Sequence, residues 1–400
     1  MNIRHILKKY RLFYNLNAFI KAAKTRKATQ KLLRHYDRIV SERGISYDRL
    51  KVPQLVKERL NNRGVKIKYK PNGKLKIFWV GACKEQDYTG FIQGLEKYGE
   101  VIQFTNRNGN YGQEFSSKKY DPDVVAANSA QLLKQIEVVL KRGEKIDVLI
   151  GQMWANTISV EALKRVQNMG IVTLNVSMDD RLPELWGKHG NILLGSVGLS
   201  DGLDLVLTSS PDCCMRYLVH GCPAVFWPMA SDPELFTPAL KKDIDVCFVG
   251  NNYGNRGNII RKLRANGIQV ETYGAGWSNG YIGPGKISEV FGRSKIILGI
   301  GTIAYNRDIF TLKLRDFDAT MAGALYLTHR NPDLLKIFSE GKEIECYLTE
   351  DEAISKISFY LKHPNLREQI AIAAASTARN YHTWEIRLGE AFFAAGLINE

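Results

Sequence analysis

Residues 74–81 read KLKIFWVG, an apolar run with branched and aromatic side chains that ends in glycine. This composition predicts a buried β-strand. Comparable runs follow along the chain and are separated by segments with helical spacing; they read IDVLIGQ (146–152), GIVTLNVS (170–177), IDVCFVG (244–250) and ALYLTH (324–329). Strands that are apolar on both faces and alternate with helices predict parallel sheets of the doubly wound α/β class.

The length of 400 residues accommodates two such domains. A polar stretch with two prolines, SDPELFTPALKKD (231–243), interrupts the alternation and predicts the link between them. We therefore expect one Rossmann-like domain over residues 71–235 and a second over residues 236–382. The expected helices between the strands cover residues 89–98, 125–142, 158–169, 255–266, 286–293 and 310–322.

The positive charge of the chain is concentrated in its first 70 residues. These hold 20 Lys and Arg against 4 Asp and Glu, a net charge of +16, whereas the remainder carries −1. Apolar residues recur there at helical spacing, at Ile3, Ile6, Leu7, Tyr10, Phe13, Tyr14, Leu16 and Ile20. We expect residues 1–70 to form a basic helical extension.

A basic helix of this kind has three possible partners: the body of the protein, an anionic membrane surface or an acidic polymer. The aromatic residues at positions 10, 13 and 14 lie among leucine and isoleucine rather than between arginines. That arrangement is not typical of a base-stacking platform. Nucleic acid is therefore not an expected partner, while the first two alternatives stay open.

Other features of the sequence argue against a membrane-spanning, secreted or metal-binding protein. No apolar stretch approaches the ~20 residues of a membrane span, and no small-residue cleavage site follows the basic N-terminus, so we expect no signal peptide. The six cysteines, at positions 83, 213, 214, 222, 247 and 346, lack metal-site spacing. We expect them to be reduced in the cytoplasm.

The segment after the 244–250 strand predicts an anion site. Gly250 permits close approach to the backbone, and the helix that follows presents free N–H groups. Arg256 lies at the start of that helix, where a cation is unfavourable to the helix dipole unless an anion lies beside it. A bound diphosphate, with Tyr253 nearby, would supply that anion; a solvent-facing Arg256 is the alternative.

A glycine-rich loop, YGAGWSNGYIGPG (273–285), follows the second strand of the C-terminal domain. Its G-x-G-x3-G spacing differs from the dinucleotide fingerprint. We place Gly274 at the edge of the site. Tyr273 or Trp277 would stack on a base, with simple packing as the alternative.

The stretch LKLRDFDATMAGALYLT (312–328) places charges in an apolar run. On a helix, Arg315 and Asp318 project near one another. The helix leads through Gly323 into an apolar strand, so these charges are expected in buried surroundings, where they need ligands or partners. Arg315 and Lys313 suit a phosphate, and Asp318 suits ribose hydroxyls; ordinary surface pairing is the alternative.

This stretch, with Gly341-Lys342-Glu343 and an H-x-W pattern at His382 and Trp384, resembles the C-terminal domain of the CgeB-like (spore-maturation) glycosyltransferases, relatives of the group 1 enzymes. The resemblance covers residues 244–390 well. The N-terminal half resembles the family more loosely, through WVGA and VSMDDRLPELW (176–186), and residues 1–70 are not covered.

The resemblance implies a GT-B fold, with two Rossmann-like domains facing a cleft and a terminal helix, 383–400, that returns to the first domain. It implies a nucleotide diphosphate-sugar as co-substrate in the C-terminal domain, and neither metal nor cofactor. Group 1 enzymes carry an E-x7-E pattern; here Phe310 takes the first place and Asp318 the second. The expected donor-binding residues are Gly250, Tyr253, Arg256, Tyr273, Gly274, Trp277, Lys313, Arg315, Phe317, Asp318 and Gly323.

The acceptor side is expected in the N-terminal domain. Asp179 and Asp180 follow the 170–177 strand, where a carboxylate would serve as general base or as a helix cap. Arg256 would neutralise the leaving group. Gln152 and Trp154, just after an earlier strand, would contact a sugar.

We therefore expect a glycosyltransferase that moves a sugar from a nucleotide diphosphate-sugar to a hydroxyl of a glycan, lipid-linked or protein acceptor. It would act in the cytoplasm on cell-envelope glycans, peripherally on the inner membrane face. The alternatives are a GT-B protein that binds sugar nucleotide or glycan without turnover, and a GT-B nucleotide-sugar epimerase.

Overall fold

The computed structural model describes residues 3–65, 69–71, 73–303, 305–306 and 308–399, with side chains from residue 18 onward. Contacts between residues divide the chain into two compact units. Unit 1 comprises Met1–His35, Arg181–Pro183 and Phe236–Ser376, and unit 2 comprises Tyr36–Asp180, Glu184–Leu235 and Thr377–Glu400.

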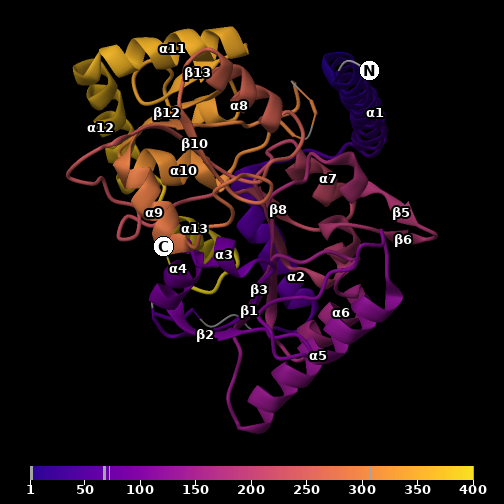
Figure 1. Ribbon diagram of the computed structural model, residues 1–400. Helices are drawn as coiled ribbons and strands as arrows, with labels where there is room; N and C mark the ends of the chain where they lie inside the picture. The colour runs from indigo at the N-terminus through magenta and orange to yellow at the C-terminus, as the bar shows by residue number, and fades with distance from the viewer. Residues whose placement is uncertain (1–2, 66–68, 72, 304, 307, 400) are drawn as a thin grey trace. The chain divides into compact units, whose positions relative to one another are not determined.

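Unit 2 is built on a six-stranded sheet with the order β2-β1-β3-β4-β7-β8 (Figure 1). All neighbouring strands are parallel, and Ile77 of β1 lies opposite Val148 of β3. The central strands are buried on both faces, which explains why their sequences are mainly apolar. The strands are β1 (Leu75–Val80), β2 (Gly99–Gln103), β3 (Val148–Gly151), β4 (Val172–Ser177), β7 (Leu205–Thr208) and β8 (Ala224–Phe226).

Helices and short turns connect the strands of unit 2. A two-stranded antiparallel hairpin, β5 (Lys188–His189) and β6 (Ile192–Leu193), extends from it. The helices are α2 (Val52–Asn62), α3 (Lys84–Asp87), α4 (Phe91–Tyr98), α5 (Pro122–Lys141), α6 (Val160–Asn168), α7 (Cys213–Val219) and α13 (Trp384–Ala394). The 3-10 turns are η1 (Arg49–Lys51), η2 (Pro183–Trp186), which begins in unit 1, and η3 (Ser196–Gly202).

Unit 1 repeats the architecture with a five-stranded parallel sheet in the order β10-β9-β11-β12-β13. Its strands are β9 (Ile244–Val249), β10 (Val270–Tyr273), β11 (Ser294–Leu298), β12 (Leu325–His329) and β13 (Glu345–Tyr347). Its helices are α8 (Arg256–Ala265), α9 (Pro284–Arg293), α10 (Leu314–Met321) and α11 (Glu350–Lys362), with the turn η4 (Leu334–Lys336). Helix α12 (Pro364–Tyr381) has residues in both units.

Helices cover both faces of this sheet. Apolar residues of α8 and α11 share one buried cluster with the strands, which includes Ile259, Leu263 and Ile357. Figure 1 shows α8 and α11 on one side of β12 and β13, with α9 and α10 toward the other side. The two parallel sheets confirm the expectation of two doubly wound domains.

Helix α10 begins four residues later than the sequence suggests. Phe310 pairs instead with Thr302 in an isolated antiparallel bridge. The Asp316 carboxylate accepts the Lys313 N–H at 2.7 Å, which stabilises the first turn of a helix that starts at Leu314. The shift places Arg315 and Asp316 in the first turn of the helix.

The basic leader is divided between the two units. Helix α1 (Ile3–Arg43) contributes to both, and its backbone is helical through the expected apolar positions 3 to 16, whose side chains lie outside the described residues. Helix α2 packs in unit 2 through Val52, Val56 and Leu60, which are buried. The assignment of residues 1–70 to a separate extension stays a prediction.

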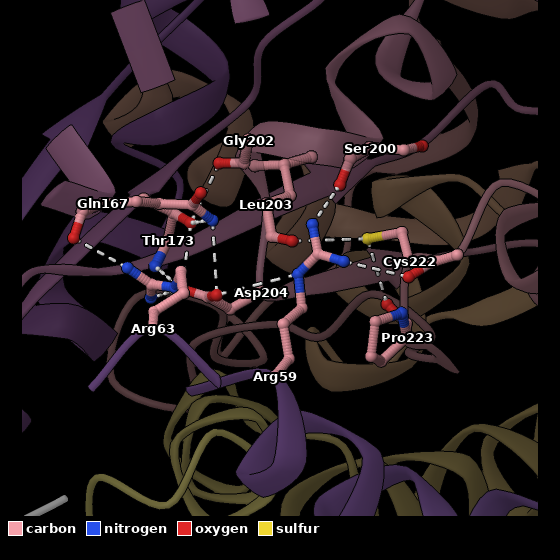
Figure 2. Close-up of polar contacts among 11 residues, drawn as sticks. Arg59, Arg63, Gln167, Thr173, Ser200, Gly202, Leu203, Asp204, Cys222 and Pro223 are labelled. Carbon is pink, nitrogen blue, oxygen red and sulfur yellow. Dashed lines mark hydrogen bonds and ion pairs between the residues drawn. The ribbon is translucent and has the colours of Figure 1, made fainter. Parts of the chain in front are cut away.

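An ion cluster anchors α2 (Figure 2). Arg63 Nη2 lies 2.6 Å from Asp204 Oδ2, and Arg59 Nε lies 3.8 Å from Asp204 Oδ1. Asp204 is fully buried and also accepts the N–H of Thr173 at 2.9 Å. Basic charge at the end of α2 therefore neutralises an internal carboxylate, which leaves the leader's exposed cations mainly on α1.

Candidate functional site

Two guanidinium groups meet at the carboxyl end of β9. A Cβ at Gly250 would lie 2.5 Å from Arg315 Nη2 and 3.3 Å from Arg256 Nη1, so a side chain there would have to displace a guanidinium group. Gly250 also has a φ of 148°, which side chains rarely adopt. Strand β9 and the first turns of α8 and α10 thus bring together three of the expected donor-binding residues, Gly250, Arg256 and Arg315.

Both arginines are buried and rest on one aromatic ring. Arg315 is 8% exposed and Arg256 is 7% exposed. Their Cζ atoms lie 4.5 Å and 5.6 Å from the ring centroid of Phe248, within cation–π distance. Arg315 Nε donates to the carbonyl oxygen of Val249 at 2.7 Å, while its buried Nη1 has no hydrogen-bond partner among the described residues. Two adjacent cations with a free N–H form a site for an anion.

Arg256 is oriented by the loop before α8. Its Nη1 donates to the carbonyl oxygen of Asn251 at 2.9 Å, and its Cζ lies 4.2 Å from the ring centroid of Tyr253. Tyr253 is 44% exposed. The loop therefore leaves an aromatic ring at the surface beside a guanidinium group.

The glycine-rich loop supports the same strand end. Trp277 Nε1 donates to the carbonyl oxygen of Gly250 at 2.7 Å, and its ring packs edge-on against Phe248. A Cβ at Gly274 would lie 2.7 Å from the carbonyl carbon of Gly250. Gly274 and Trp277 thus position Gly250. The hydroxyl of Tyr273 donates to Glu271 at 2.5 Å.

Helix α10 places the remaining expected donor residues at different depths. Lys313 is half-buried next to Arg315, and Asp318, one turn further on, is 5% exposed. Phe317 is fully buried and packs against Phe338 in the core. A Cβ at Gly323 would lie 2.8 Å from Pro238, which explains this glycine by packing at the other end of the helix.

A neighbouring carboxylate, Asp316, serves the fold. It accepts the hydroxyl of Tyr326 at 2.5 Å as well as the Lys313 N–H. Both Asp316 and Tyr326 are fully buried, and burial raises the pKa of each. The contact ties α10 to β12 and fixes the helix that carries Arg315.

In unit 2, the two adjacent aspartates after β4 differ in environment. Asp180 is 2% exposed, and its carboxylate accepts the hydroxyls of Ser177, Thr208 and Tyr217 at 2.5, 2.6 and 2.8 Å. Burial raises its pKa, and the hydroxyls partly oppose this. The geometry gives Asp180 a structural role, whereas Asp179 is exposed.

Gln152 and Trp154 follow β3, as expected. The Gln152 amide oxygen accepts a hydrogen bond from Gln86 Nε2 at 3.3 Å. The ring of Trp154 packs edge-on against Phe115, with 5.9 Å between centroids, and Phe115 is 54% exposed. Gln152 is 7% exposed, so the exposed ring of Phe115 is the part of this region that suits contact with a sugar. The sequence alone did not indicate Phe115 or Gln86.

A buried carboxyl group lies at the end of β1. The Tyr111 hydroxyl donates to Asp87 Oδ2 at 2.6 Å, and Trp79 Nε1 donates to the Tyr111 oxygen at 2.8 Å. A Cβ at Gly81 would lie 2.4 Å from that oxygen. Burial raises the pKa of Asp87 to about 6, in spite of these hydrogen bonds.

The described residues offer neither a metal site nor a membrane span. No three His, Cys, Asp or Glu side chains among them are grouped so that they could hold a metal ion. In the same part of the chain, no helix has the length and apolarity that crossing a membrane requires.

Two parallel doubly wound units, with a cationic site at the first strand–helix turn of one of them, have the architecture of the GT-B fold. Residues 256–392 match the family described as "Glycosyl transferase-like". The match confirms the resemblance seen in the sequence. No curated protein sequence matches the chain.

Solved structures share the fold at low sequence identity. Sucrose-phosphate synthase from Thermosynechococcus elongatus superposes with a TM-score of 0.56 and 11% identity, covering 80% of this chain and 98% of that one. Anabaena Alr3699/HepE in complex with UDP-glucose superposes with a TM-score of 0.57 and 11% identity, covering 81% of this chain and 100% of that one. A glycosyltransferase from Rickettsia africae ESF-5 superposes with a TM-score of 0.53 and 12% identity, covering 81% of this chain and 98% of that one.

Proposed function

We propose that the protein transfers a sugar from a nucleotide diphosphate-sugar to an acceptor hydroxyl. The observation that carries the proposal is the pair of buried guanidinium groups at Gly250. Two cations that share one ring and leave an N–H unpartnered favour a doubly charged anion such as a diphosphate.

In the proposed reaction, the acceptor oxygen forms a bond to the anomeric carbon, and the bond from that carbon to the diphosphate oxygen breaks. The leaving diphosphate gains charge, which Arg256, Arg315 and Lys313 stabilise. Asp318 binds the ribose hydroxyls, and Tyr253 or Trp277 lies against the base. The acceptor proton passes to a base, for which Asp179 is the exposed candidate.

A UDP-sugar is the donor to test first, because Anabaena HepE, which shares the fold, has been solved with UDP-glucose. The acceptor is a glycan, lipid-linked or protein hydroxyl on the unit 2 side, where Gln152, Trp154 and Phe115 would contact it. Donor binding by guanidinium and ammonium groups needs no metal.

We also propose that the protein works in the cytoplasm at the inner face of the membrane, on cell-envelope glycans. The cations of the leader that do not neutralise internal carboxylates lie mainly on α1. A helix with that charge favours an anionic lipid surface.

The proposal is tested by calorimetry with UDP and by measuring free UDP released from UDP-glucose. Arg315→Ala should weaken UDP binding by about 10- to 100-fold, because it removes charge-assisted hydrogen bonds. Arg330→Ala is the control, since Arg330 is half-exposed and pairs with Glu340. Undiminished UDP binding by Arg315→Ala would refute the assigned site.

Turnover separates the enzyme from a protein that only binds the nucleotide. An enzyme should release UDP slowly even without acceptor, since water replaces the acceptor hydroxyl. If UDP does not bind, a thermal-shift screen against GDP-, ADP-, CMP- and dTDP-sugars identifies the nucleotide, because a ligand of the folded state raises the melting temperature. Tight binding with no UDP release would favour a binding protein.

A further inference from the structure

A groove of about 880 Å³ lies within unit 1 between α1 and the outer face of α8. Residues 305, 306 and 308 and Glu350 complete its walls. Its volume falls in the range of small-molecule sites. The groove is distinct from the Gly250 site, whose arginines are not among its lining residues.

Small side chains keep the groove open. Ala18, Ala22 and Ala23 line it from α1, and Ala265 lines it from α8. The lining positions of α1 continue at residues 26 and 27, so one face of the helix borders the groove. Larger side chains at the alanine positions would fill the space.

The charges of the groove favour an anion. It contains four cationic and two carboxylate side chains, namely Arg26, Lys27, Arg261, Lys262, Asp308 and Glu350. Arg26 pairs with Asp308 at 2.8 Å, and Lys262 lies 4.0 Å from Glu350. Lys27 and Arg261 have no carboxylate partner within the part of the chain that is described; Arg261 Nη1 donates to Asn258 Oδ1 at 2.9 Å.

An exposed aromatic residue borders the same space. Phe19 lines the groove and is 72% exposed. Its neighbour on α1, Ile20, is 43% exposed. Phe19 and Ile20 therefore place exposed apolar side chains on the same helix as the cations Arg26 and Lys27, a combination that can contact both the acyl region and the headgroups of anionic lipid.

We propose that this groove binds the phosphate of an anionic phospholipid headgroup. Lys27 and Arg261 hold the phosphate, and Phe19 enters the region of the acyl chains. The inference rests on the membrane association proposed above and assigns it to a site. Clustered basic side chains on a helix attract anionic lipid headgroups.

The first test uses the full chain and dihexanoyl phosphatidylglycerol below its micelle concentration, because single lipid molecules have no surface potential. Calorimetry should show one site per chain. The double variant Lys27→Ala/Arg261→Ala should weaken binding at least about tenfold, since it removes two phosphate contacts. The control Lys24→Ala/Lys31→Ala makes the same charge change at exposed positions of α1 outside the groove and should bind normally.

A second pair of variants tests the space itself. Ala22→Trp should fill the groove and abolish binding of the short-chain lipid. Ala28→Trp, at an exposed position of the same helix that does not line the groove, should leave it unchanged. Co-sedimentation with phosphatidylcholine vesicles, with and without phosphatidylglycerol, extends the comparison to a membrane.

Three results would overturn the inference: equal weakening by both double variants, no effect of Ala22→Trp, or inorganic phosphate binding as tightly as the lipid. The first would mean diffuse attraction to α1, and the last a site for free anions. UDP titration of the same variants separates this failure from that of the transferase proposal, since none of these substitutions alters the Gly250 site.

Discussion

Arg315 Nη2 lies 2.5 Å from the position that a Cβ would take at Gly250. The side chain reaches this point because its Nε donates to the carbonyl oxygen of Val249, the last residue of β9. A residue of α10 is thus held by backbone 66 positions earlier in the chain. The contact is the most direct geometric support for an anion site in unit 1.

Gly250→Ala should therefore impair the site more than the fold. The new methyl group would displace the Arg315 guanidinium, and we expect UDP affinity to fall about tenfold or more. The backbone strain at a φ of 148° should also lower the free energy of unfolding by about 1–2 kcal/mol. Calorimetry and urea unfolding measure the two effects separately.

Gly283→Ala is the matched control for this substitution. Gly283 has a φ of −74°, and a Cβ there would meet nothing within 4 Å. It should leave both UDP affinity and stability nearly unchanged. Equal UDP binding by the two alanine variants would contradict the assigned role of Gly250.

Phe248→Leu tests the ring beneath the two guanidinium groups. Leucine keeps an apolar side chain in β9 but removes the π face that lies 4.5 Å from Arg315 Cζ. The loss of a partly desolvated cation–π contact should weaken UDP binding by about three- to tenfold. A variant that stays folded by circular dichroism and binds UDP like the original chain would exclude the ring from the site.

Part of this site could be predicted from the sequence. Gly250 and Arg256 follow an apolar strand, and Arg315 interrupts an apolar run. The local sequence pattern is therefore enough to predict these three residues as members of the site. Phe248 could not be selected, because within an apolar strand nothing marks the one ring that faces two cations. The sequence pattern also selects Phe317 and Gly323 as ligand contacts. Their packing against Phe338 and Pro238 could not be predicted, because it depends on residues distant in sequence.

The adjacent aspartates after β4 show most directly which features of a site the sequence alone does not predict. Asp179 and Asp180 are equivalent in the sequence, yet only Asp180 is enclosed. Its partners Thr208 and Tyr217 come from β7 and α7, so their approach depends on the register of the sheet. The fold class, in contrast, follows from the repeated apolar strands alone.

Arg63→Ala should destabilise unit 2. The substitution leaves the fully buried carboxylate of Asp204 with only Arg59, at 3.8 Å, as a cationic neighbour. Breaking a buried ion pair from one side costs about 3–5 kcal/mol. Urea unfolding measures the loss, and Arg38→Ala is the control, because Arg38 is an exposed cation of α1. A loss below about 1 kcal/mol would mean that α2 is not held by this pair.

Asp87 should make the stability of the protein depend on pH between about 4 and 6. Its pKa is about 6 in the folded chain, against 3.8 when unperturbed. The folded state thus holds the proton more tightly, and the free energy of unfolding falls as pH rises through this interval and then levels off. The expected fall from pH 4 to pH 7 is about 2 kcal/mol, at about 1.4 kcal/mol per pKa unit.

Asp87→Asn isolates this contribution, because asparagine does not titrate and its amide oxygen can still accept the Tyr111 hydroxyl. The variant's stability relative to the original chain should increase by about 2 kcal/mol between pH 4 and pH 7. Urea midpoints at pH 4, 5, 6 and 7 give the difference, and Asp201→Asn, which removes an exposed carboxylate, is the control. A difference that stays constant over this range would show that Asp87 is ionised as readily in the folded chain as in the unfolded one, and that the enclosure around Gly81 admits water.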